Sequence, residues 1–113
     1  MDRKKVIAID FDGTLFENAF PDIGPPRNEV IEWAIKAKQR GNLIVLWTCR
    51  DGDTLQKAIE ACASCGLVFD AVNDMPIEWF EPKGNPKYRK MFADVYVDDR
   101  AMTPEDAIKN YEI

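Results

Sequence analysis

The stretch VIAIDFDGTL, residues 6–15, joins an apolar run to an acidic turn, and it is the clearest indication of the fold in this chain. Residues 6–9 are apolar and rich in β-branched side chains, which is typical of a buried strand. Asp10 and Asp12 follow, and their side chains point the same way if the strand stays extended through them. Gly13 then permits a sharp turn. We therefore expect a buried strand that delivers two carboxylates to its carboxyl end.

Three more strands are indicated downstream of this stretch, at residues 43–47, 67–72 and 94–97. The run at 43–47 is continuously apolar, as expected for a strand covered on both faces. The run at 67–72 is weaker because Asp70 interrupts it, and the run at 94–97 leads into a second pair of aspartates. The sequence thus predicts a sheet of four strands.

Helical patterns fill the gaps between these strands. Apolar residues follow helical spacing after residues 25–26 as far as Gly41, and again after Asp53 as far as Gly66. Thr103 is placed to cap a last short helix. This alternation predicts a Rossmann-like α/β three-layer sandwich, with a mostly parallel sheet and helices on both faces. In such sheets ligands bind beyond the carboxyl ends of the strands.

Composition supports one compact domain over residues 1–113, since 46% of the chain is hydrophobic. The net charge of −5 argues against broad binding to nucleic acid or to an anionic membrane. The apolar run after the N-terminus is too short for a signal peptide or a membrane span, so we expect a cytoplasmic protein. Cys62 and Cys65 have CxxC spacing without a second pair or any histidine, which favours buried structural thiols over a zinc or redox site.

The second strand also ends in polar residues, which suit a phosphate group. Thr48, Cys49 and Arg50 follow this strand directly and precede a helix, so they can cradle a phosphate. A basic cluster before the fourth strand could supply one ammonium to balance the phosphate charge. We prefer Lys87 for this role, with Lys83 and Lys90 left open as alternatives.

A second acidic pair, Asp98 and Asp99, follows the fourth strand. This pair would lie beside Asp10 and Asp12 if the first and fourth strands are neighbours in the sheet. Carboxylates that converge without histidine or thiolate form a hard, oxygen-rich site, which suits Mg²⁺ rather than zinc or copper. The sequence leaves open whether Asp98 or Asp99 would bind the metal directly.

The order of these motifs resembles the haloacid dehalogenase superfamily of phosphatases over residues 6–100. The resemblance rests on DFDGTL, a threonine at a strand end, a lysine, and an apolar strand that ends in VDD. It implies a Mg²⁺-dependent phosphatase in which Asp10 is the nucleophile and Asp12 the general acid/base. It also implies that Thr48 and Lys87 hold the phosphoryl group. The implied metal ligands are Asp10, the main-chain carbonyl of Asp12, and Asp99 with Asp98 beside it.

The chain departs from many members of that superfamily because it has no room for a cap domain. The segment 16–26 is long enough only for a flap, and one helix joins the second and third strands. The site would therefore be open, and selectivity would come from a partner subunit in a homo-oligomer or from a large substrate. Trp79-Phe80, in a loop bounded by prolines, could mark such a contact between protomers.

Several readings of the function stay open at this point. A small phosphorylated metabolite or nucleotide is the preferred substrate. Thr48-Cys49-Arg50 and Asp98-Asp99-Arg100 are also similar to the phosphatase half of polynucleotide kinase/phosphatases, so an end-phosphate of nucleic acid is an alternative that the net acidity does not favour. A receiver-like signalling domain would need Asp70 or Asp74 as its phosphoacceptor. A catalytically silent binding protein is the last alternative, although all four motif positions are filled.

Overall fold

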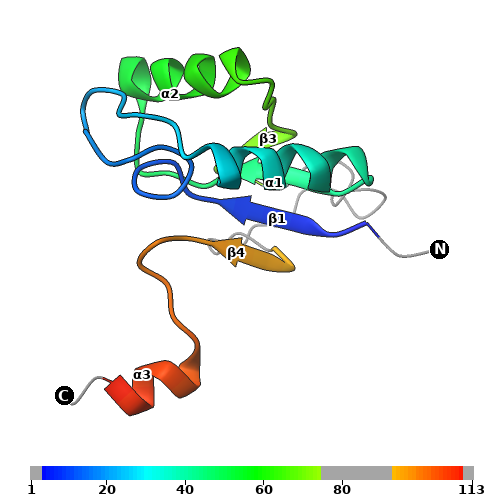
Figure 1. Cartoon of the computed structure of the whole chain (residues 1–113), viewed down its shortest axis with the longest axis vertical. Coiled ribbons are helices and arrows are strands. Elements are labelled where there is room, and N and C mark those ends of the chain that lie inside the picture. Colours follow the sequence, from blue (N-terminus) through cyan, green and yellow to red (C-terminus); the bar gives the residue numbers. More distant parts are fainter. Residues whose placement is uncertain (1–3, 75–92, 111–113) are drawn as a thin grey trace.

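The computed structural model describes residues 4–74 and 93–110. Strands and helices alternate along the chain, as the sequence predicts (Figure 1). The strands are β1 (Val6–Ile9), β2 (Leu43–Leu46), β3 (Ala71–Val72) and β4 (Val95–Val97). The helices are α1 (Asn28–Gln39), α2 (Gly52–Ser64) and α3 (Pro104–Asn110). None of the helices in the described ranges is long and apolar enough to cross a membrane.

The four strands form a single parallel sheet in the order β3-β2-β1-β4. Ile9 at the end of β1 lies opposite Leu46 of β2 on one side and Val97 of β4 on the other. The chain runs outward from β1 to β3 and then returns to the other side of β1. The order therefore reverses between β1 and β4, and such a switch point is where open α/β sheets bind their ligands.

Both faces of β1 and β2 are buried, which explains why these inner strands are apolar at every position. In β1, Ile7 and Ile9 pack against α1 and α2, whereas Val6 and Ala8 belong to a second buried cluster on the opposite face. The same alternation runs through β2. The architecture is thus the Rossmann-like three-layer α/β sandwich that the sequence predicts.

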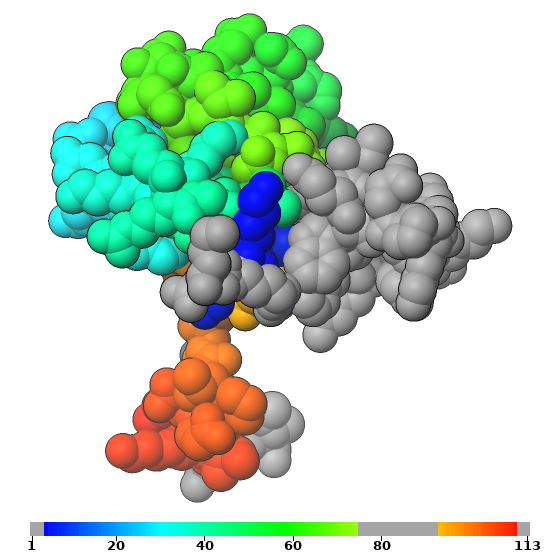
Figure 2. Space-filling view, turned by 90° about the vertical axis from the view of Figure 1, so that its right-hand side faces the viewer, coloured from blue at the N-terminus to red at the C-terminus, as the bar shows by residue number. Residues whose placement is uncertain are grey.

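The helices are distributed differently from the expectation of helices on both faces. Among the described residues, α1 and α2 share one face of the sheet, because β1, β2 and β3 follow one another in one direction and like-handed crossovers place both helices on the same side. Helix α3 has no buried residue. Figure 2 shows α3 and the segment that leads to it projecting from the other described residues.

Several element boundaries differ from the sequence prediction. Strand β2 ends at Leu46, one residue early, and β3 covers only its last two predicted residues. Both long helices end before the expected glycine, and the Thr103 hydroxyl caps α3 by accepting a hydrogen bond from the amide of Asp106 at 3.1 Å. Cys62 is buried as expected, and burial raises its thiol pKa to about 12, but Cys65 is exposed because it follows the last turn of α2.

Two aspartates set the register of the outer strands. Asp70 donates its amide to the carbonyl of Ile44 at 2.8 Å, and its carboxylate accepts the amide of Ile44 at 2.7 Å. Asp94 brackets Val6 in the same way, with both distances 2.7 Å. Each carboxylate thus accepts a hydrogen bond that a main-chain carbonyl would otherwise accept between the two strands. Asp70 therefore holds β3 beside β2, and the regular main-chain pairing of β3 begins only after it.

We predict that Asp70→Ala lowers the free energy of unfolding by about 1–3 kcal/mol, because the amide of Ile44 loses its acceptor in a partly buried position. Asp70→Asn keeps an acceptor oxygen and loses only the charge that faces Lys38 at 3.3 Å, so it should cost less than about 1 kcal/mol. Urea unfolding of both variants measures the difference. Equal losses of unfolding free energy in the two variants would show that the hydrogen bond from the Ile44 amide to the Asp70 side chain does not stabilise the fold.

Candidate active site at the switch point

The segment after β1 is a tight turn built on one carbonyl oxygen. The amides of Thr14, Leu15 and Phe16 all donate to the carbonyl of Phe11, at 3.1 to 3.2 Å. Gly13 has a φ of +86°, and a Cβ at this position would overlap the carboxylate of Asp99. Glycine is thus required both for the backbone conformation and for the close approach of Asp99.

Three carboxylates converge beside this turn. Asp10 follows β1, and Asp98 and Asp99 follow β4, its neighbour in the sheet. One oxygen of each carboxylate lies within 4.8 Å of the others. The expectation that the two acidic segments meet is confirmed, because β1 and β4 pair in parallel and end at the same edge.

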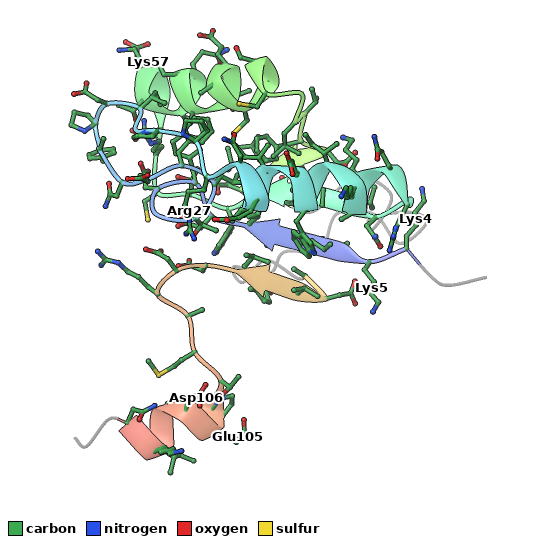
Figure 3. All side chains as sticks on the ribbon, in the orientation of Figure 1. Lys4, Lys5, Arg27, Lys57, Glu105 and Asp106 are labelled. Atoms are coloured by element: carbon green, nitrogen blue, oxygen red, sulfur yellow. The ribbon has the colours of Figure 1, made fainter. Side chains whose placement is uncertain are left out.

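Thr14 joins the two halves of this carboxylate cluster. Its buried hydroxyl donates to Asp10 Oδ2 at 3.1 Å and accepts the amide of Asp99 at 3.0 Å. Thr14 was not among the residues predicted for the site, although it lies within DFDGTL. Figure 3 shows Arg27 near the same end of β1, where its Nη1 donates to the carbonyl of Gly13 at 3.0 Å.

The electrostatics of the cluster favour a bound cation. The pKa of Asp10 is raised from 3.8 to about 6, chiefly by burial and next by the Asp98 carboxylate, while hydrogen bonds from Thr14 and Phe11 oppose the shift. Within the described ranges, no ion pair joins any of the three carboxylates to a cation. All donors are hard carboxylate oxygens, so the set fits Mg²⁺ better than a soft metal.

Asp12 is held apart from the other carboxylates by Arg50. Arg50 Nε donates to Asp12 Oδ2 at 2.8 Å, and Nη2 donates to Oδ1 at 2.7 Å, a bidentate pair. The Arg50 side chain is 1% exposed, and its other hydrogen bonds go to main-chain carbonyls. The assignment of Arg50 to the phosphate is therefore wrong for this structure, because every N–H of the guanidinium already has an acceptor.

The loop after β2 is fixed by Asn73, which was not among the residues predicted for the site. Asn73 accepts the amide of Thr48 at 2.7 Å and donates to its carbonyl at 2.9 Å. Asn73 adopts a φ of +52°, a conformation that asparagine tolerates better than most residues. The Thr48 hydroxyl accepts the amide of Arg50 at 3.1 Å, and Cys49 between them is exposed. Thr48 and Cys49 thus lie at the correct edge of the sheet, beside the end of β1.

An open cavity of about 740 Å³ adjoins this edge. Its lining combines the aromatic side chains of Trp47 and Tyr96 with Asp98 of the cluster. Both aromatic residues lie on the face of the sheet opposite α1 and α2, since Trp47 packs on the second buried cluster and Tyr96 pairs with Ala8. The cavity is large enough for a small ligand.

Two expectations lie outside the described residues. Lys83, Lys87 and Lys90 fall in the segment 75–92, as does Trp79-Phe80. The site lysine and the aromatic contact between protomers therefore stay predictions. The expected flap is described, and it closes on itself through a hydrogen bond of 2.8 Å from the amide of Glu17 to the carbonyl of Pro25.

Fold and site together define an α/β protein with a cluster of carboxylates at the topological switch point. The chain is 32% identical to a conserved protein from Bacteroides thetaiotaomicron of known structure, with a TM-score of 0.77. The match covers 98% of this chain and 94% of that one, so this chain belongs to the same family as the Bacteroides protein. No protein-family model matches the sequence, and no curated protein matches it either.

The raised pKa of Asp10 predicts how stability depends on pH when metal is removed. Between about pH 4 and pH 6 the folded protein holds a proton on Asp10 that the unfolded chain releases, so the stability contribution of Asp10 falls as the pH rises through this window. Asn at position 10 cannot ionise. In EDTA, we expect Asp10→Asn to melt about 3 °C or more above the wild type at pH 7, and the gap to close near pH 4.

Thermal melting of both proteins across this range measures the gap. A gap of the same size at pH 4 and pH 7 would show that burial and the neighbouring carboxylates do not raise the pKa of Asp10 in the folded protein.

Proposed function

We propose that this protein is a Mg²⁺-dependent phosphohydrolase, similar to haloacid dehalogenase phosphatases without a cap domain. The observation that carries the proposal is the meeting of Asp10 with Asp98 and Asp99, which are far apart in sequence, at the switch point of a parallel sheet. Open α/β sheets bind their ligands at this switch point, beyond the carboxyl ends of the strands. A cluster of like charges there is unfavourable unless a cation or a shared proton compensates it.

Asp10, Asp98 and Asp99 would hold the Mg²⁺ ion, with the main-chain carbonyl of Asp12 as a further oxygen ligand implied by the resemblance. When bound, the ion would offset the repulsion between the Asp10 carboxylate and a phosphate and would stabilise the charge of the transferring phosphoryl group. It would also lower the pKa of Asp10, which must be ionised in order to attack.

The chemistry then belongs to two side chains. Asp10 attacks phosphorus in line with the leaving oxygen, and an aspartyl-phosphate forms as the bond to the leaving group breaks. Asp12 donates a proton to the leaving oxygen. In the second step a water molecule attacks the aspartyl-phosphate, gives its proton to Asp12, and releases inorganic phosphate from Asp10. Thr48 would hold the phosphoryl group beside Asp10.

The substrate class we favour is a small phosphorylated metabolite or a nucleotide. The cavity beside Asp98 has room for the leaving group of such a compound. A polynucleotide end-phosphate is the less well supported substrate, because the Arg50 side chain is buried and hydrogen-bonded to Asp12 and does not face the surface where a nucleic acid would bind. The net charge of −5 points the same way.

The receiver-like alternative does not fit the topology. Receiver domains have the strand order 2-1-3-4-5, in which the third strand lies next to the first. Here β2 separates β3 from β1. Asp70, one of the two candidate phosphoacceptors, lies at the amino end of β3, where its carboxylate accepts the Ile44 amide and faces Lys38.

The flap of residues 16–26 is too short to be a cap domain, so a homo-oligomer that covers the open site stays part of the proposal. A cytoplasmic location is likewise a prediction from the sequence.

We predict that the purified protein releases phosphate from members of a panel of phosphorylated metabolites and nucleotides in Mg²⁺, and that EDTA abolishes the release. Asp10→Asn should lower kcat by at least about 1000-fold, because it removes the nucleophile but keeps the shape of the side chain. Asp70→Asn is a matched control, since it makes the same chemical change at the opposite end of the sheet.

Residual turnover near the wild-type rate in purified Asp10→Asn would rule out Asp10 as the nucleophile. Release that is unchanged in EDTA would rule out the metal. A phosphorylated oligonucleotide in the same panel separates the end-phosphatase reading from the preferred one.

A further inference from the structure

Arg50 joins three parts of the molecule through its five hydrogen bonds. Two go to the carboxylate of Asp12, at 2.7 and 2.8 Å. Two go to the flap, at the carbonyls of Asp22 (2.7 Å) and Pro21 (3.3 Å), and one goes to the carbonyl of Thr54 in α2 (3.1 Å). The guanidinium is therefore saturated with acceptors.

Two aromatic rings lie against the guanidinium of Arg50. Its central carbon lies 4.9 Å from the ring centroid of Phe11 and 5.1 Å from that of Phe20, which belongs to the flap. Only 1% of the Arg50 side chain is exposed, compared with 19% for Asp12. Burial of a charge at this depth is favourable only when it is paired and fully hydrogen-bonded, so the geometry of the pair is tightly constrained.

We propose that Arg50 is a positioning residue, which orients the carboxyl group of Asp12 for proton transfer to the leaving group and couples that orientation to the flap. The inference rests on the proposed phosphohydrolase function and adds a role that differs from phosphate binding. Arg50 touches neither phosphate nor metal in this account. It acts through Asp12.

The pairing leaves lone-pair positions of the Asp12 carboxyl group open to the leaving group and to water. A carboxylate has roughly four lone-pair positions, and Arg50 occupies one on each oxygen. A proton held at a remaining position can pass to the leaving oxygen as its bond to phosphorus breaks, and the water of the second step returns one. Fixing a proton donor in one orientation is the role that a third residue plays for a catalytic base.

The flap contributes to the same constraint. Asp22, Pro21 and Phe20 contact the guanidinium from one loop, whose ends are tied by the bond between Glu17 and Pro25. Displacement of the flap therefore removes acceptors from Arg50 and loosens Asp12. A leaving group that contacts the flap would act on the proton donor through this connection.

The test compares leaving groups that need a proton with one that does not. For Arg50→Lys, which keeps the charge but loses the bidentate geometry, we expect kcat/KM with phenyl phosphate to fall about 100-fold. With 2,4-dinitrophenyl phosphate, whose leaving group departs as a stable anion, we expect kcat/KM to fall by no more than about threefold, because kcat/KM does not include the later hydrolysis of the aspartyl-phosphate, in which Asp12 also takes part. The inhibition constant of inorganic phosphate should stay within about twofold, because Arg50 does not touch the phosphate.

Phe20→Ala provides a second variant that folds readily, since Phe20 is 58% exposed. It removes one wall of the guanidinium site and should give the same selective loss at a smaller size, about fivefold. Val68→Ala, a truncation of a side chain that is 60% exposed and far from Arg50 in sequence, should leave both substrates unaffected.

Equal losses with both substrates, or an inhibition constant of phosphate raised about tenfold or more, would overturn the positioning role and leave the phosphohydrolase function intact. No Mg²⁺-dependent turnover of either substrate by the wild type would overturn the proposed function and this inference together.

Discussion

Mutual repulsion among Asp10, Asp98 and Asp99 is the constraint on which the rest of the site depends. Each of the three carboxylates gives one oxygen to a space 4.8 Å across, and the pKa of Asp10 rises to about 6 as a result of burial and of these neighbours. The fold keeps them there by pairing β1 with β4 and by tying Asp10 to the segment of Asp99 through the buried Thr14. The cluster is thus locally unfavourable for stability, as is common at functional sites, and under the proposed function a bound cation would compensate the repulsion.

Around this cluster the polar side chains have separate tasks. Thr14 and Gly13 shape the turn that lets Asp99 approach, and Asn73 fixes the backbone of Thr48. Arg50, the only buried arginine in the described ranges, binds Asp12 and the flap, and in the proposed mechanism it orients the proton donor. Within the described residues, the groups that order the site thus come from the loops that follow the strands and from the flap.

The sequence predicted much of this arrangement and missed specific parts for physical reasons. The strands at residues 6–9 and 43–46 are apolar at every position, and the convergence of Asp10 with Asp98 and Asp99 follows from parallel pairing once β4 lies beside β1. The extent of β3 could not be predicted from the sequence, because the side chain of Asp70, and not a main-chain carbonyl, accepts the hydrogen bond from the amide of Ile44. The contacts of Arg50 depend on Asp12, which is 38 residues away in the sequence, and on how the flap folds back over the guanidinium. Neither can be predicted from a local sequence pattern.

In the proposed mechanism Asp10 carries the phosphoryl group, and this intermediate can be trapped. Asp12→Asn, which slows release of the intermediate by removing the acceptor of the water proton, would be mixed with 2,4-dinitrophenyl phosphate and Mg²⁺, quenched in acid, and analysed by peptide mass spectrometry. The account predicts one phosphoryl group on the peptide that contains Asp10, labile to hydroxylamine and absent when EDTA is present. A substrate that is turned over while the phosphoryl group appears on another residue, or on none, would contradict it.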